Sequence, residues 1–173
     1  MKSPKKRRNP YVIGRPIDEP ELFFGRESLF GFIEDNLKNN EQVILLHGQR
    51  RIGKSSVLRH IPNKVNLDNE FVCVLSDFQD KNQCSLREVV HGLAKDIVEK
   101  LTVEKFIDNP DVIDLTFLDD LEQDLEQDGV KFREFLEQVY EKLGDKKLVL
   151  LLDEFDVLDG KILNQNLKIS FDI

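Results

Sequence analysis

The sequence predicts an α/β fold, in which helices cover a mainly parallel sheet in a three-layer sandwich. Short aliphatic runs alternate along the chain with longer segments of helical periodicity, as expected of strands joined by crossover helices. The last of these runs is aliphatic at every position, which is typical of a strand buried on both faces. A glycine-rich loop separates the first run from a helix, as at the end of a strand in such sheets. The 173 residues are enough for one hydrophobic core and too few for two ordinary domains.

The N-terminal residues are strongly basic and differ from the rest of the chain. Their basic side chains are Lys2, Lys5, Lys6, Arg7 and Arg8. Together with two prolines they predict a disordered arm and linker over residues 1–20, ahead of a core at 21–160. The arm could contact nucleic acid phosphates or an anionic surface, or it could be a solubilising leader without a partner. The net charge of −8 and the nine acids without a base at 108–128 weigh against DNA binding.

The first elements of the core follow from periodicity and helix breakers. Residues 27–37 are predicted to form a helix, because apolar side chains recur along one face. Residues 43–46 are predicted to be the first core strand, which leads into the glycine-rich loop. The helix after the loop, residues 54–61, is expected to end at Pro62. Residues 71–75 are predicted to be the second strand.

The next helix is marked by its N-terminus. Ser85 and Glu88 have the spacing of a capping box, in which each side chain satisfies a backbone N–H group of the first turn. Apolar side chains then recur along one face as far as Leu101. The sequence therefore predicts a helix that begins at this box and ends near Leu101.

The acidic part of the chain is predicted to contain two helices. The first, shorter helix covers residues 116–126 and leads to Gly129. The second covers residues 130–143 and is closed by Gly144, because glycine is common just after the last helical residue.

The glycine-rich loop has the complete pattern G-x-x-x-x-G-K-S. Its residues are Gly48, Gln49, Arg50, Arg51, Ile52, Gly53, Lys54 and Ser55. Backbone N–H groups of such a loop turn inward around phosphates, and the glycines permit backbone angles that a side chain would obstruct. Lys54 can then reach the β- and γ-phosphates, and Ser55 can ligate Mg²⁺ at the positive end of the following helix. The loop predicts binding of a nucleoside triphosphate, and Ser56 is included among the candidate contacts.

Two acids end the last aliphatic run, residues 148–152. Asp153 and Glu154 would lie at the C-terminal end of a buried parallel strand, where such sheets bind their ligands. Asp153 is predicted to hold Mg²⁺ through its water shell. Glu154 is placed to polarise a water against the γ-phosphate, which predicts a hydrolase rather than a protein that only binds the nucleotide.

The base is predicted to be adenine. Neither of the usual guanine-site patterns, N-K-x-D and D-x-x-G, is found. Residues 63–66 begin like the first pattern but end in Asn66 and lie too close to the phosphate loop, so we interpret them as a helix-to-strand turn.

Four segments together resemble a known family. They are Asn9 to Pro16, Phe23 to Glu27, Gly48 to Ser55, and Leu150 to Asp156. The combination resembles the prokaryotic STAND ATPases and their AAA-type relatives, and archaeal origin-recognition ATPases share much of it. The resemblance implies a P-loop NTPase fold, ATP as the nucleotide, and a hydrophobic-Gly-Arg-Glu segment against the adenine. Gly25 and Arg26 are therefore candidate base-side contacts, although the same segment could simply be the turn that enters the helix at Glu27.

The chain departs from this family after the acidic strand. Such ATPases place a further strand, with a residue that senses the γ-phosphate, between the phosphate-loop strand and the acidic strand. Residues 155–173 are too few for that strand and its preceding helix, an arginine finger, a second sensor and a C-terminal domain. Residues 161–173 are expected to be a short tail with an edge strand, because residues 167–173 alternate apolar and polar. We therefore expect a C-terminally incomplete sandwich, from a truncated product or an N-terminal fragment.

Three function classes follow from these observations. The first is a slow ATPase that acts as a conformational switch, as the resemblance implies. The second is a nucleotide-dependent binding module or an inactive fragment, and the third is a DNA-associated ATPase supported by the basic arm alone. Arg50 and Arg51 could add phosphate contacts or be exposed loop positions. The sequence leaves open a protein partner or self-association.

Composition indicates a cytoplasmic protein. No apolar run approaches the roughly eighteen residues of a membrane span, and the N-terminus lacks the hydrophobic core of a signal peptide. Cys73 and Cys84 have no metal-ligand spacing, and we interpret the first as a small core residue. The three histidines are scattered and predict no ligand cluster.

Overall fold

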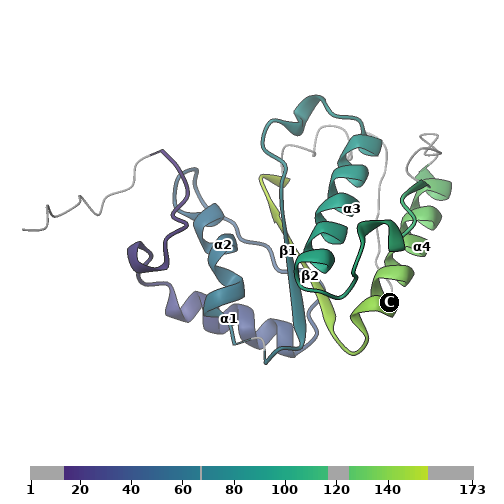
Figure 1. The fold of residues 1–173 in the computed structure, drawn as a ribbon. Helices are drawn as coiled ribbons and strands as arrows, with labels where there is room; N and C mark the ends of the chain where they lie inside the picture. The colour runs from purple at the N-terminus through teal and green to yellow at the C-terminus, as the bar shows by residue number, and fades with distance from the viewer. Residues whose placement is uncertain (1–13, 67, 117–124, 156–173) are drawn as a thin grey trace, which may run out of the picture. The chain divides into compact units, whose positions relative to one another are not determined.

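The computed structural model describes residues 14–66, 68–116 and 125–155 (Figure 1). The chain divides into two compact units, Met1–Leu67 and Asp68–Ile173, and each has its own architecture. The predicted acidic helix falls mostly outside the described residues, as does the predicted tail at 161–173. No helix among the described residues is long and apolar enough to cross a membrane.

The first unit contains the 3₁₀ helix η1 (Pro20–Leu22) and the helices α1 (Glu27–Lys38) and α2 (Lys54–Lys64). The predicted helix at 27–37 is confirmed by α1, whose buried side chains are Phe30, Ile33 and Leu37. The prediction that Pro62 ends the next helix is wrong, because α2 continues to Lys64. Proline removes the hydrogen bond of its own nitrogen and crowds the preceding turn, so a proline in the last turn leaves the following residues free to stay helical.

The predicted first strand, residues 43–46, is not a strand in the structure. The segment is irregular, and Val43 and Leu45 are 71% and 84% exposed. A strand needs a hydrogen-bonded neighbour, and in the described residues the sheet contains only two strands, which pair with each other. An aliphatic run is therefore not enough to form a strand where no partner strand is present.

The second unit is built on a parallel pair of strands, β1 (Phe71–Asp77) and β2 (Lys147–Asp153). Their register places Val72 opposite Leu148 and Asp77 opposite Asp153. Both strands confirm the predicted elements, and β1 is two residues longer than expected. Because the strands are parallel, their C-terminal ends lie at the same edge of the sheet.

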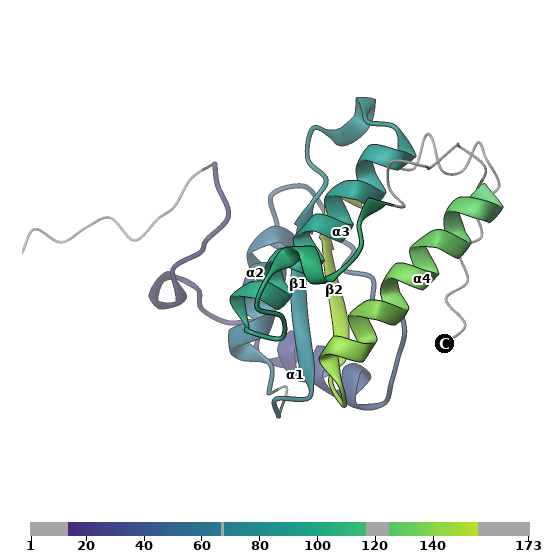
Figure 2. The same cartoon turned by 45° about the vertical axis from the view of Figure 1, so that its right-hand side comes forward.

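Two long helices cover one face of this sheet, α3 (Leu86–Val103) and α4 (Leu125–Leu143), as Figure 2 shows. Short 3₁₀ helices, η2 (Lys81–Gln83) and η3 (Pro110–Val112), flank α3. The hydrophobic core lies between the helices and the sheet, and its members include Val72, Val74, Ile97, Leu101, Phe135 and Val139. Side chains alternate along a strand, so Asp77 and Asp153 belong to the opposite face.

The ends of these helices test the capping predictions. The capping box at the start of α3 is confirmed, since Glu88 N–H donates to Ser85 Oγ and Ser85 N–H donates to Glu88 Oε2 at 2.6 Å. Gly144 follows α4 with a positive φ of 63°, as predicted. The break expected at Gly129 is wrong, because α4 runs through it. One helical glycine costs only about 1 kcal/mol, less than the buried apolar face of α4 contributes.

Candidate functional site

The phosphate loop turns directly into α2, and its backbone conformation depends on two glycines. Gly53 is the residue before the helix and has a φ of 96°, which side chains rarely adopt. A Cβ atom on Gly48 would lie 3.2 Å from Cγ2 of Ile52, closer than ordinary contacts allow. Arg51 also has a positive φ, of 64°. The loop therefore favours glycine at residue 53 because of the backbone conformation and at residue 48 because of the space beside Ile52.

The lysine of the motif lies over this loop. Lys54 Nζ donates to the carbonyl oxygens of Gly48 at 3.1 Å and Gln49 at 3.4 Å. Because α2 begins at Lys54, the ammonium lies at the positive end of the helix, where the backbone N–H groups of the first turn also point outward. Ser55 is half-buried in the first turn. This arrangement fits a group with several negative charges, such as a triphosphate.

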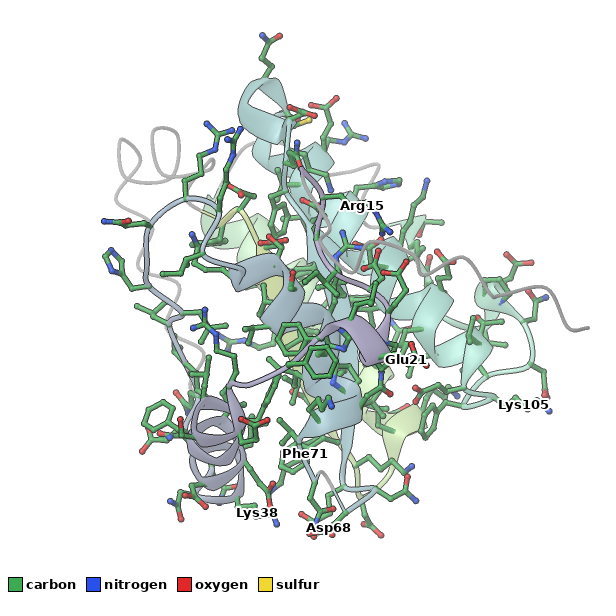
Figure 3. The ribbon with its side chains drawn as sticks, turned by 90° about the vertical axis from the view of Figure 1, so that its left-hand side faces the viewer. Arg15, Glu21, Lys38, Asp68, Phe71 and Lys105 are labelled. Atoms are coloured by element: carbon green, nitrogen blue, oxygen red, sulfur yellow. The ribbon has the colours of Figure 1, made fainter. Side chains whose placement is uncertain are left out.

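A second segment lies along α2 next to the loop. We call residues 15–24 the N-terminal strap; Figure 3 follows it from Arg15 to Glu21. Ile17 N–H donates to Ser56 Oγ at 2.9 Å, and the ring of His60 donates from Nε2 to the carbonyl oxygen of Ile17 at 3.0 Å. Arg59 pairs with Asp18 at 3.0 Å. The predicted contact Ser56 is thus buried and uses its hydroxyl to hold the strap.

An aromatic contact fixes the far end of the N-terminal strap. The ring of Phe23 stacks on His60 with 4.3 Å between centroids, and it meets Phe30 of α1 edge to face. Phe23 and His60 are both almost fully buried. A carbonyl can only accept, so the bond to Ile17 requires the proton of the imidazole on Nε2. The strap therefore has a fixed position relative to the phosphate-loop helix.

A cavity of about 260 Å³ lies where the N-terminal strap meets the phosphate loop. It is lined by Ile17, Leu22, Phe23, Phe24, Arg26, Ile52, Gly53 and Ser56. The structure thus brings Arg26, predicted as a base-side contact, together with three residues of the predicted phosphate-binding set. Gly25 lies between two lining residues and has a φ of 76°. Arg26 also donates from Nη2 to the carbonyl oxygen of Ile52 at 2.9 Å.

The two predicted acids end β2 in the second unit. Asp153 is buried at 6% exposure, and its Oδ1 accepts from the N–H of Glu154 at 3.1 Å. Glu154 is exposed and has a φ of 54°, so the chain turns sharply directly after the strand. The phosphate loop belongs to the first unit, and these acids belong to the second.

Sequence reasoning missed a third acid at this edge, Asp77. It ends β1 in register with Asp153, and its Oδ1 accepts from the N–H of Gln79 at 2.8 Å. The ladder continues one step further, since Phe78 N–H donates to the carbonyl oxygen of Asp153 at 3.0 Å. The available signal was an acid two residues after the apolar run 71–75, much as Asp153 follows the aliphatic run 148–152.

Comparison with known proteins identifies the family. Residues 37–172 match the AAA domain family, which is most of the chain. No curated protein and no solved structure gives a significant match. The chain therefore belongs to the AAA domain family and has the P-loop NTPase fold, as the resemblance implied. The match begins after the N-terminal strap, so Gly25 and Arg26 lie outside it.

Proposed function

We propose that this AAA-type domain binds Mg²⁺-ATP on the loop Gly48 to Ser55 and hydrolyses it slowly as a conformational switch. The observation that carries the proposal is the curled loop with Lys54 held over its carbonyl groups at the positive end of α2. In this arrangement the ammonium belongs to the first residue of α2, whose N-terminal backbone N–H groups would contact the β- and γ-phosphates. The family membership supports the same nucleotide chemistry.

The adenine is proposed to occupy the cavity between the N-terminal strap and the phosphate loop. Its walls are mostly aliphatic and aromatic, which suits a flat heterocycle. Phe24 lines it and is 79% exposed, so its ring is accessible for stacking. The cavity adjoins Gly53 and Ser56, and a base placed there would be continuous with phosphates on the loop.

We further propose roles in magnesium binding and catalysis for the residues of the two motifs. Ser55 and Asp153 would hold the magnesium ion, the aspartate through its water shell. The ion, when bound, neutralises charge that develops on the phosphate oxygens. Glu154 would orient the attacking water and accept its proton as the oxygen attacks the γ-phosphorus, and the bond to the β–γ bridging oxygen breaks to release ADP. Arg50 and Arg51 are exposed on the loop and are available for further phosphate contacts.

The exposed position of Glu154 makes this assignment directly testable. Glu154→Gln keeps the size of the side chain but removes the proton acceptor. We expect unchanged Mg²⁺-ATP affinity by calorimetry and phosphate release slowed by about 100-fold or more. Glu141→Gln on the exposed face of α4 is the control and should leave both unchanged.

Two other results would revise the proposed function. Normal phosphate release by Glu154→Gln would remove this residue from the mechanism. If wild-type protein binds Mg²⁺-ATP but releases no phosphate above the Glu154→Gln background, the chain is a nucleotide-dependent binding module rather than an ATPase.

A further inference from the structure

Arg26 lies at the junction between the N-terminal strap and α1, and its backbone is fixed there. Gly25 and Arg26 both have positive φ values, 76° and 71°, so two successive residues lie in the left-handed region just before the helix. The carbonyl oxygen of Arg26 then accepts from the N–H groups of Leu29 at 2.9 Å and Phe30 at 3.0 Å, in the first turn of α1. The position from which the guanidinium extends is therefore set by the helix.

The guanidinium of Arg26 contacts the phosphate loop. Its Nη2 donates to the carbonyl oxygen of Ile52 at 2.9 Å, which links residues far apart in the sequence. The Arg26 side chain is exposed, so water competes for this hydrogen bond and the bond adds little to the stability of the fold. Its effect is to favour one conformation of the phosphate loop.

Ile52 belongs to both parts of the predicted nucleotide site. It is the loop residue before Gly53, and it also lines the cavity proposed for the base. A Cβ on Gly48 would crowd Cγ2 of Ile52 at 3.2 Å, so the isoleucine side chain packs closely over that glycine. A group that holds the carbonyl of Ile52 in place therefore holds both the Ile52 side chain, which is a wall of the cavity, and the backbone conformation of the loop.

We propose that Arg26 is a positioning residue that acts through Ile52, holding the base cavity and the phosphate loop in one geometry. The inference rests on the proposed binding of a nucleoside triphosphate. It assigns Arg26 a role different from direct contact with the base or the phosphates. Its consequence is that the protein favours a ligand with both a base and phosphates over phosphates alone, because one hydrogen bond orders the groups that bind each.

A double-mutant cycle between Arg26 and Ile52 tests this role. Arg26→Asn removes the guanidinium, while asparagine tolerates the positive φ and is favoured at the residue before a helix. Ile52→Ala removes the wall that Arg26 would position. The measurement is the dissociation constant for Mg²⁺-ATP of wild type, both single variants and the double variant, by calorimetry. Arg15→Asn is the control, since that guanidinium pairs with Glu19 at 2.9 Å within the N-terminal strap.

The proposal expects non-additive effects. Arg26→Asn alone should weaken Mg²⁺-ATP binding about three- to tenfold, the range of one hydrogen bond. It should weaken binding less when Ile52 is already alanine, because the side-chain wall is then missing and only the carbonyl that shapes the loop remains for Arg26 to hold. Tripolyphosphate with Mg²⁺, which has no base, should lose less affinity than ATP does. Arg15→Asn should bind ATP as wild type does.

Other results would overturn the inference. Additive effects of Arg26→Asn and Ile52→Ala would mean that Arg26 contacts the nucleotide itself, and equal losses for ATP and tripolyphosphate would identify it as a phosphate ligand. If Arg26→Asn does not fold, as judged by circular dichroism, Arg26→Gly, which tolerates the positive φ and also removes the guanidinium, enters the same cycle with the same criterion of non-additivity. Equal ATP binding by wild type and Lys54→Ala would instead contradict the proposed function.

Discussion

Single residues determine the shape of the phosphate loop, and glycines illustrate this most clearly. Gly53 has a φ of 96°, whereas Gly31 lies on the exposed face of α1 in ordinary helical conformation. The ideal Cβ at either position meets no atom within 4 Å, so space does not distinguish them. The difference between the two positions is therefore entirely in the backbone.

Alanine substitution is therefore predicted to have opposite effects on stability at Gly53 and at Gly31. Gly53→Ala should lower the free energy of unfolding by about 1 to 2 kcal/mol and weaken the binding of Mg²⁺-ATP, because the alanine is forced into a left-handed conformation. Gly31→Ala should raise the free energy of unfolding by up to about 1 kcal/mol, because alanine is the better helix former. Urea unfolding of both variants checks the signs, and equal effects would show that the loop backbone is not strained.

A buried thiol gives a prediction about pH. Burial raises the pKa of Cys73 from its ordinary 9.0 to about 11. A raised pKa in the folded state means that the neutral thiol stabilises the fold fully below pH 9.0, and that this contribution is lost as the pH rises toward 11. The stability advantage of wild type over Cys73→Ala should therefore shrink by about 2 kcal/mol between about pH 8 and about pH 11. If urea unfolding shows the same dependence of stability on pH for wild type and Cys73→Ala, the raised pKa of Cys73 is contradicted.

For whole elements, hydrophobic periodicity and the signals at helix ends predicted the structure correctly wherever tertiary packing favours the same element. The start of α3 at its capping box and the end of α4 at Gly144 were both predictable, since neighbouring residues in the sequence form these contacts. Gly129 was misleading because one glycine costs only about 1 kcal/mol in a helix that its other residues favour. Pro62 was misleading because it lies in the last turn of α2, where the residues after it can stay helical. The segment 43–46 was misleading for the opposite reason, since a strand depends on a partner that local sequence cannot supply.

The packing of α4 can be tested at its centre. Phe135 has no exposed surface and packs against both the sheet core and Phe132, whereas Val130 on the same helix is 52% exposed. Phe135→Ala should lower the free energy of unfolding by about 3 to 5 kcal/mol, through lost burial and the cavity it leaves. Val130→Ala should change it by less than about 0.5 kcal/mol. If both variants lose similar amounts of unfolding free energy in urea, α4 does not pack on the sheet through Phe135.

At the scale of the whole molecule, the sequence predicted the motifs but not the contacts that join them. The phosphate loop and the acids of β2 were recognisable because their chemistry needs particular residues at fixed spacing. The role of Ser56 in holding Ile17, the cavity beside Phe24 and the bond from Arg26 to Ile52 were not, because each joins residues distant in sequence. Asp77 also becomes part of the acidic edge only through the register of β1 with β2.

Nucleotide binding on the phosphate loop can be tested by a thermal melt with and without Mg²⁺-ATP. At about a hundred times the dissociation constant, ATP should stabilise wild type by about 2.7 kcal/mol, a rise in Tm of roughly 5 to 10 °C. Lys64→Ala, at the other end of α2, should show the same rise, and Lys54→Ala should show none. A rise in Lys54→Ala equal to that of wild type, or no rise in wild type, would contradict the account.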